Sequence, residues 1–357
     1  MQDCFTPVRR TTGTRQIAVI IPAHNEGKWL TATIESVLAQ SRPPDRILVY
    51  ANACADDTVA VAERYPVEVV ESPGNEGRKA GALNRGLDIV LPGMHPGDLV
   101  MCMDGDTQVH EHLLRNAEAH FAADPLLGAV SSNHLIKRFG TLIELLQAME
   151  YERDRRFIGR RKGRFGCMTG MAAVYRVAAL RQVATRYGTV YDPKNWTEDW
   201  KLTIALKHLR WGMVRPQNCL ATTVPVSDMR GLFTQRERWA RGYLQTLMQF
   251  GMTRWTFIPW LKQAGLGWSI LSRLVLFFLL YTTRHHLAAE WMIPVVIILT
   301  ADAVNTVHKA GWRATLLALA FPVEIFYAWL VTAAIVSGYF KQLTGAGASD
   351  TWKKVRR

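Results

Sequence analysis

The stretch Leu99-Val100-Met101-Cys102-Met103-Asp104-Gly105-Asp106 joins an apolar run directly to two carboxylates separated by one glycine. Five apolar residues bounded by polar ones are typical of a buried strand. Two carboxylates at the end of such a strand can share one divalent ion, and the glycine leaves room for a ligand to approach the backbone. Taken alone, the triplet fits a turn with helix-capping aspartates equally well.

The sequence before this stretch alternates between short β-branched runs and segments whose apolar residues recur at helical spacing. Strands are expected at 17–21, 46–50, 67–71 and 98–103, and helices at 29–40, 57–65 and 79–91. Repeated strand–helix–strand units predict a parallel sheet with binding sites at the carboxyl ends of its strands. The polar loops of this region all fall at such ends.

The composition indicates a folded, basic protein. The chain has 357 residues, 43 Lys and Arg against 30 Asp and Glu, a formal net charge of +13 and 49% hydrophobic residues. This apolar fraction excludes a disordered chain, and the length allows about two or three domains. Five scattered cysteines without CxxC spacing indicate neither a disulfide framework nor a zinc site. The sequence also lacks a GxxxxGK[ST] loop and a GxGxxG motif after the first strand, so P-loop and dinucleotide-binding proteins are disfavoured.

The C-terminal part of the sequence is apolar enough to enter a membrane. Three segments are mostly apolar, at 264–283, 287–307 and 314–340. Each has about 20 residues or more, which is the length needed to cross a bilayer. We expect the chain to divide into five parts: a polar N-terminal segment (1–16), a cytosolic catalytic domain (17–250), an interfacial amphipathic segment (251–268), about three transmembrane helices (269–340) and a basic tail (341–357).

Each expected span carries ionisable residues, namely Arg273 in the first, Glu290 and Asp302 in the second and Glu324 in the third. Such residues are costly in lipid, so these segments either pack against protein or line a polar path. Three spans that begin in the cytosol would also place the basic tail outside, against the positive-inside tendency. Either one segment is re-entrant or interfacial, or the tail breaks the rule.

Four further motifs accompany the Asp104-Gly105-Asp106 triplet. In chain order they are Pro22-Ala23-His24-Asn25-Glu26, Arg78-Lys79-Ala80-Gly81-Ala82-Leu83-Asn84, Thr197-Glu198-Asp199 and Gln235-x-x-Arg238-Trp239. With them, the chain resembles the membrane-integrated family 2 glycosyltransferases, the group containing cellulose, hyaluronan and poly-N-acetylglucosamine synthases. The resemblance covers roughly residues 17–250 and continues into the apolar segments. It implies an α/β fold of the GT-A type, a Rossmann-like mixed sheet with flanking helices, followed by an α-helical membrane domain.

The resemblance implies a nucleotide and metal site. The nucleotide is expected to contact Pro22, His24, Asn25, Glu26, Asn52, Lys79, Asp104 and Arg238, and a Mg²⁺ or Mn²⁺ ion is expected to bind Asp104 and Asp106. Asn52 stands where the family usually has an acidic residue that contacts uracil, so UDP is expected but another nucleotide is not excluded. His24 fits a hydrogen-bonded loop histidine better than a catalytic one.

The resemblance also implies the catalytic groups. Asp199 is the expected general base, and Arg238 neutralises charge on the departing UDP, so that one displacement inverts the anomeric carbon. The acceptor is expected to contact Cys167, Thr169, Gly170, Glu198 and Trp239. A single tryptophan is more often a core residue, but within the Gln-x-x-Arg-Trp motif the stacking role is favoured.

Together these features predict an inverting, metal-dependent transferase that moves a sugar from a nucleotide-sugar donor to a glycan, lipid or protein acceptor at the membrane. Processive polysaccharide synthesis and single transfer both stay open, because three spans make a narrow channel unless copies of the chain form a homo-oligomer. A membrane-anchored nucleic-acid-binding protein is the alternative from another class, but no nucleic-acid-binding motif accompanies the +13 charge. The expected location is the plasma (inner) membrane, multi-pass, with a cytoplasmic catalytic domain.

Overall fold

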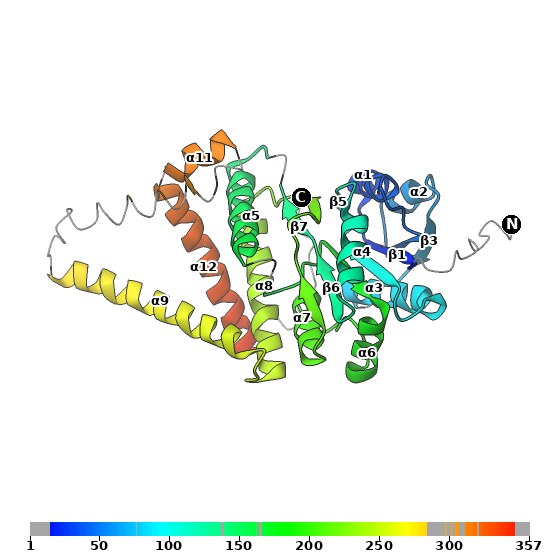
Figure 1. Ribbon diagram of the computed structural model, residues 1–357. Coiled ribbons are helices and arrows are strands. Elements are labelled where there is room, and N and C mark those ends of the chain that lie inside the picture. Colours follow the sequence, from blue (N-terminus) through cyan, green and yellow to red (C-terminus); the bar gives the residue numbers. More distant parts are fainter. Residues whose placement is uncertain are drawn as a thin grey trace.

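The structure, a computed structural model, describes residues 15–75, 77–136, 139–161, 163, 166–283, 311–319 and 321–346, with single positions at 297, 301, 304, 305 and 307. Nearly all of the expected N-terminal segment, most of the second expected span and most of the basic tail lie outside these residues. Figure 1 shows a sheet flanked by helices in the first part of the chain and long helices in the second.

The main sheet has seven strands in the order β3-β2-β1-β4-β8-β6-β9. Their bounds are β1 (Ile17–Ala23), β2 (Arg46–Asn52), β3 (Glu68–Ser72), β4 (Leu99–Met103), β6 (Leu127–Ser131), β8 (Ala172–Arg176) and β9 (Gly212–Val214). Strand β1 pairs in parallel with β2 and β4, and β2 with β3, whereas β8 runs antiparallel to β4 and β6. The parallel order expected for the first four strands is confirmed, and the sheet as a whole is mixed.

Helices cover both faces of this sheet, which is why the central strands are apolar throughout. The helices are α1 (Gly27–Leu38), α2 (Thr58–Ala62), α3 (Arg78–Val90), η1 (Leu91–Gly93), α4 (Leu113–Ala123), α6 (Val177–Tyr187) and α7 (Glu198–His208). Ile21 of β1 shares one core cluster with Ile34 of α1, and Ile20 shares the other with Leu87 of α3. Successive side chains of a strand point to opposite faces, so a strand buried on both faces needs a continuous apolar run.

A second, three-stranded sheet was not expected from the sequence. It has the order β5-β10-β7, with bounds β5 (Thr107–Val109), β7 (Asn133–Leu135) and β10 (Leu220–Thr223). Strand β10 runs antiparallel to β5 and parallel to β7. Strands this short carry no readable alternation of apolar and polar residues, and their partners are more than 80 positions away along the chain.

The remaining helices are α5 (Leu142–Arg160), α8 (Met229–Phe250), α9 (Phe257–Thr283), α11 (Trp312–Leu319) and α12 (Phe321–Thr344). Helix α12 lies along α8 (Figure 1), and Lys341 Nζ lies 2.9 Å from Glu237 Oε2 across that contact. Arg153 of α5 forms two hydrogen bonds to Glu324 of α12, at 2.6 and 3.1 Å. For Glu324 the cost of an acidic group in an apolar helix is therefore met by packing against protein.

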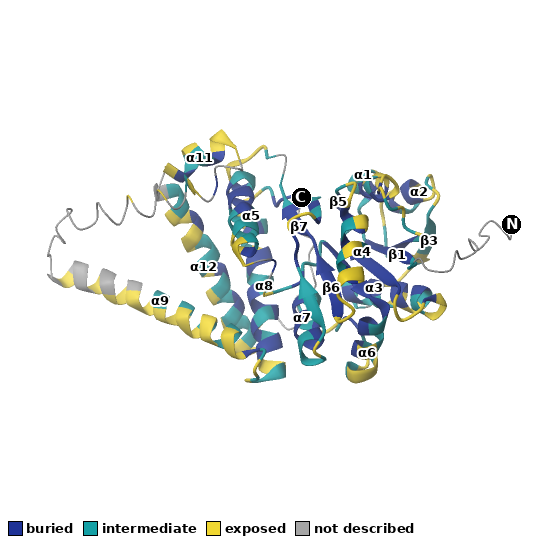
Figure 2. Cartoon of the chain, viewed as in Figure 1, coloured by how far each residue is buried: buried dark blue, intermediate teal, exposed yellow. Residues whose placement is uncertain are grey.

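The described helices match the expected membrane segments only in part. Helix α9 is continuous and covers residues 257–268 of the interfacial segment together with the first expected span. The third expected span is divided between α11 and α12. By length and composition, one stretch of the described chain could cross a bilayer, Val323–Thr344, with a mean hydropathy of 1.5. Much of α9 is exposed (Figure 2), including Trp268, Leu271 and Phe278.

Candidate active site

A cavity of about 980 Å³ opens between the carboxyl ends of β1, β2 and β4 and the helices α5, α7 and α8. The expected nucleotide and metal residues in its wall are Pro22, His24, Glu26, Asn52, Lys79, Asp104, Asp106 and Arg238. The expected acceptor and base residues in its wall are Cys167, Thr169, Gly170, Glu198, Asp199 and Trp239. The tertiary structure therefore brings together side chains that are more than 200 positions apart in the sequence.

Asn25 is the expected site residue that lies outside the cavity wall. Its backbone is left-handed, with a φ of 56°, and its Oδ1 accepts a hydrogen bond of 2.7 Å from the backbone N–H of Ala55. Asparagine tolerates this conformation better than most residues because its short side chain bonds locally. In this structure Asn25 shapes the loop after β1 rather than facing the cavity.

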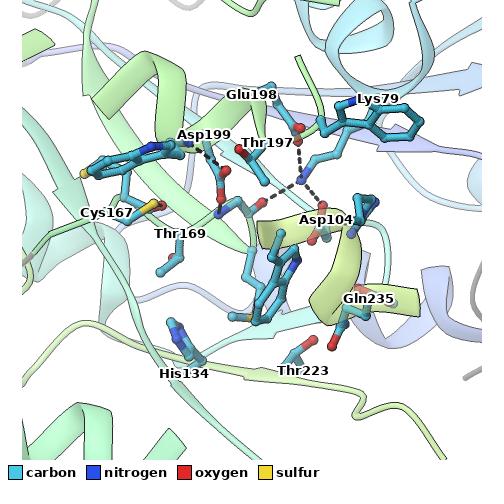
Figure 3. Close-up of a pocket in the computed structure, with 18 of the residues that line it drawn as sticks. Lys79, Asp104, His134, Cys167, Thr169, Thr197, Glu198, Asp199, Thr223 and Gln235 are labelled. Carbon is cyan, nitrogen blue, oxygen red and sulfur yellow. Dashed lines mark hydrogen bonds and ion pairs between the residues drawn. The ribbon is translucent and has the colours of Figure 1, made fainter. Parts of the chain in front are cut away.

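Lys79 contacts residues from three different parts of the cavity wall (Figure 3). Its Nζ lies 2.5 Å from Asp104 Oδ1 and 3.5 Å from Glu198 Oε1, and it donates a 3.0 Å hydrogen bond to the carbonyl of Gly170. Burial lowers the pKa of Lys79, but Asp104 and then Glu198 outweigh it and raise the pKa above its usual value. Lys79 is therefore a cation that links the end of β4 to the start of α7 and to the loop before β8.

Asp199, in the first turn of α7, is held by two backbone groups. Its Oδ2 accepts a 3.0 Å hydrogen bond from Gly170 N–H, and its Oδ1 accepts one of 2.7 Å from Trp200 N–H. Burial, followed by the nearby charge of Glu198, raises the pKa of Asp199 to about 6. A fixed carboxylate whose pKa lies near neutrality is suited to accept a proton from a hydroxyl.

Two glycines are closely packed around these groups. A Cβ at Gly170 would lie 2.9 Å from Lys79 Nζ and 3.3 Å from Asp199 Oδ2. A Cβ at Gly105 would lie 3.0 Å from Glu26 Cγ and 3.3 Å from the carbonyl oxygen of Pro22. Gly105 lies in the cavity wall, and the approach of a ligand to its backbone stays a prediction.

The loops after β1 and β2 are cross-linked by hydrogen bonds. His24 Nδ1 lies 2.7 Å from the carbonyl of Asn52, which agrees with a hydrogen-bonded loop histidine. Asn52 Nδ2 donates to Asn75 Oδ1 at 2.7 Å. Asn52 is thus in the cavity wall with its amide group already oriented by a neighbouring loop.

Helix α8 carries the Gln-x-x-Arg-Trp motif and presents Gln235, Arg238 and Trp239 to the cavity. The helix starts at a capped end, where Asp228 Oδ1 accepts a 2.8 Å hydrogen bond from the N–H of Gly231. The guanidinium carbon of Arg236 lies 4.1 Å from the centre of the Trp239 ring. Trp239 is therefore fixed by a cation–π contact within its own helix as well as being part of the cavity wall.

The loop before β8, which carries three of the expected acceptor residues, lines the cavity. Thr169 Oγ1 lies 3.1 Å from Ser131 Oγ, and the N–H of Thr169 donates to the same Ser131 hydroxyl oxygen at 3.1 Å. Burial, and then the charge of Asp199, raises the pKa of the Cys167 thiol well above its usual value. Cys167 therefore stays protonated and contributes shape and a weak donor rather than a nucleophile.

Asp104 and Asp106 fit a divalent cation that is shared with a substrate. Both face the cavity from the end of β4, and carboxylate oxygen is the ligand type that Mg²⁺ and Mn²⁺ prefer. Within the part of the chain that the structure describes, no group of three or more His, Cys, Asp or Glu side chains forms a metal site. Mg²⁺ commonly takes only one or two carboxylates and completes its shell with waters and substrate phosphates, so two are enough.

Arg78, Trp196 and Arg241 are among the residues of the cavity wall that received no role in the sequence analysis. Each lies beside or near a residue that received one. Arg78 begins the motif that contains Lys79, and Trp196 directly precedes Thr197-Glu198-Asp199. Arg241 follows Arg238 by three positions, which places both on one face of α8. The helical spacing was the available signal for Arg241.

Comparison with protein families and curated sequences gives a consistent picture. A family model described as "Glycosyltransferase like family 2" matches residues 14–242. The chain is 26% identical over 266 residues to a poly-beta-1,6-N-acetyl-D-glucosamine synthase of Staphylococcus epidermidis, covering 71% of this chain and 60% of that protein. It is 27% identical over 245 residues to the enzyme of the same name from Staphylococcus aureus, covering 65% of this chain and 56% of that protein. The chain thus spans about 60% or less of the length of these relatives.

Among solved structures, the chain resembles the mannosyltransferase PcManGT from Pyrobaculum calidifontis, in complex with GDP-Man and Mn²⁺. The TM-score is 0.59 and the identity 22%, over 94% of this chain and 89% of that one. At this identity the similarity shows a shared fold.

Proposed function

Because the family model matches more than half of its length, the chain belongs to the family 2-like glycosyltransferases, and we propose that it transfers a sugar from a nucleotide-diphosphate donor to an acceptor hydroxyl with inversion. The observation that carries this proposal is that Asp104, Asp106, Asp199 and Arg238 line one cavity. A base for the acceptor and positive charge for the leaving diphosphate are the groups that such a displacement needs.

In the proposed reaction Asp199 accepts the proton of the acceptor hydroxyl. The hydroxyl oxygen forms a bond to the anomeric carbon while the bond from that carbon to the diphosphate oxygen breaks, so the configuration inverts. The hydrogen bonds from Gly170 and Trp200 hold the Asp199 carboxylate in one orientation. Preorganised geometry of this kind lowers the barrier because little reorganisation is needed during the reaction.

Arg238 and Lys79 are proposed to bind the leaving nucleoside diphosphate, whose negative charge grows as the bond breaks. Despite burial, the carboxylate neighbours of Lys79 raise its pKa above the usual value, and Lys79 lies in the cavity wall with Arg238. Trp239 is proposed to stack against an acceptor sugar ring, and Cys167, Thr169, Gly170 and Glu198 to line the acceptor's position. Pro22, His24, Glu26 and Asn52 are proposed to shape the base and ribose site.

A divalent ion is proposed to bind Asp104 and Asp106, and when bound it supplies positive charge to the diphosphate. Asp106→Ala is expected to weaken the Mn²⁺-dependent part of UDP binding about tenfold or more, because one of two protein ligands is lost. Isothermal titration of UDP with and without Mn²⁺ measures this effect. Asp88→Ala, on α3 and not in the cavity wall, is the matched control. Equal UDP affinity of the natural protein with and without Mn²⁺ would contradict the metal assignment.

The proposed donor is a UDP-sugar, and the synthases of N-acetylglucosamine polymers among the relatives make UDP-N-acetylglucosamine the first donor to test. We expect the full chain in detergent to release UDP from it and to form a ladder of long radiolabelled products. Asp199→Asn provides the background. One sugar per acceptor would support single transfer instead of polymer synthesis. Release of nucleotide from no member of a UDP- and GDP-sugar panel would contradict the proposed function.

The protein is proposed to act at the plasma (inner) membrane with its catalytic part in the cytoplasm. The support comes from the apolar stretch Val323–Thr344 and from the exposed apolar side chains of α9, such as Trp268 and Phe278. We expect the chain to stay with membranes after an alkaline carbonate wash and to be released by detergent. Release by the wash alone would show peripheral binding.

A further inference from the structure

Two arginines contact one tryptophan in the wall of the cavity, and a third arginine lines the same cavity. The guanidinium carbon of Arg78 lies 5.0 Å from the centre of the Trp196 ring, and that of Arg241 lies 4.4 Å from it. Arg238 lines the same cavity one helical turn before Arg241. Contacts of this kind hold a guanidinium in place. Arg241 is also held by a 3.4 Å hydrogen bond that its Nε donates to Gln342 Oε1.

The positive charges are close enough to affect one another. Burial, followed by the charges of Arg238 and Arg241, lowers the pKa of Arg78 below its usual value. Arg241 is itself buried, with 7% of its surface exposed. Positive charges that lie close together in a partly buried site repel one another. An anion that binds there reduces this repulsion.

The backbone at Arg78 has an unusual conformation. Gly77 and Arg78 both have left-handed backbones, with φ values of 73° and 55°, immediately before the body of α3. A non-glycine residue in that region is strained, and such strain collects at functional sites. The next residue, Lys79, contacts Asp104, and Arg78 and Asp104 line the same cavity.

Helix α8 fixes Trp196 from the other side. The N–H of Trp196 donates to Gln245 Oε1 at 3.2 Å, and Asn195 Nδ2 donates to Thr246 Oγ1 at 3.1 Å. The loop that carries Trp196 is therefore attached to the same helix that carries Arg238 and Arg241. These bonds and the two contacts to the Trp196 ring position Arg78 and Arg241 before a ligand binds, which lowers the cost of ordering them.

We propose that Arg78 and Arg241, aligned on Trp196, form with Arg238 a cationic clamp that binds the diphosphate of the donor nucleotide without requiring a metal ion. This inference rests on the proposed function and adds to it a share of nucleotide affinity that the two carboxylates at the end of β4 do not provide. The group recognised is the second phosphate, which a nucleoside diphosphate has and a nucleoside monophosphate lacks.

Isothermal titration of UDP and UMP in the presence of EDTA tests the clamp. The natural protein is expected to bind UDP about tenfold or more tightly than UMP under these conditions, since charge-assisted hydrogen bonds contribute most of the difference. Arg78→Gln and Arg241→Gln are each expected to lose most of this preference while UMP affinity changes less than about twofold. Arg78→Lys should retain part of it because the charge is kept.

Arg186→Gln on α6, outside the cavity, is the matched control and should leave both affinities unchanged. Trp196→Leu removes the surface that positions Arg78 and Arg241 and should reduce the preference for UDP without altering UMP binding. Thermal unfolding confirms that each variant is folded. If the natural protein binds UDP more tightly than UMP in EDTA and the arginine variants keep the same preference, the clamp is ruled out and the proposed function is not affected. Absence of UDP binding with and without Mn²⁺ would instead count against the proposed function.

Discussion

Asp199→Asn is expected to reduce sugar transfer about 10³-fold while nucleotide binding persists, because the variant keeps the shape of the side chain and loses the base. Gly170 and Trp200 donate hydrogen bonds to different oxygens of Asp199. Asparagine has one oxygen, so the variant keeps one of these two hydrogen bonds. The measurement is the initial rate of UDP release together with UDP affinity. Asp192→Asn, a neighbouring aspartate that contacts Lys201, is the control.

The same assignment predicts a pH dependence. The pKa of Asp199 is raised to about 6, so the carboxylate is ionised and active above that pH and protonated and inactive below it. The transfer rate should therefore rise with pH through about 6 and then level off. The residual activity of Asp199→Asn should not show this fall in rate below about pH 6, which is the acid limb of the pH profile. Turnover close to that of the natural protein in the variant, or a rate that does not fall in acid, would rule out Asp199 as the base.

Lys79→Met is the second large effect that we expect. It removes the cation between Asp104 and Glu198 and should lower turnover about tenfold to 100-fold, as expected for the loss of a charged partner inside a site. Lys201→Met, the same substitution on α7, is the matched control. Steady-state kinetics with a saturating donor measure the effect.

The sign of the accompanying pH shift distinguishes Lys79 from a merely structural residue. The charge of Lys79 lowers the pKa of Asp199, whereas that of Glu198 raises it. Lys79→Met should therefore move the acid limb of the pH profile upward from about 6, and Glu198→Gln should move it downward. Shifts in the same direction for both variants would show that Asp199 does not titrate under the control of these neighbours.

The sequence predicted the first half of the sheet correctly because local patterns decide it. The continuous apolar runs of β1 and β4 and the helical spacing in α1 and α3 are each visible within a dozen residues. The second sheet escaped prediction because its strands have three or four residues and pair across long separations. Local propensity carries little information about such pairings.

The membrane segments show a similar division. The apolar composition of Phe321–Thr344 is plain from the sequence, and so is the apparent cost of Glu324. The partner that offsets this cost, Arg153, lies 171 positions earlier on α5. Whether an acidic residue in an apolar helix is buried against protein depends on that partner, so composition alone left the question open.

The sequence by itself determined which chemical groups the protein carries and that most of them follow strands or begin helices, because strand ends and helix starts are written in neighbouring residues. The tertiary structure decided that Asp104, Lys79, Asp199 and Arg238 share one cavity, that Gly105 packs against protein, and that Arg78 and Arg241 meet at Trp196. Contacts between distant segments depend on how the whole core packs, and the relative positions of charged groups in that packing set their pKa values.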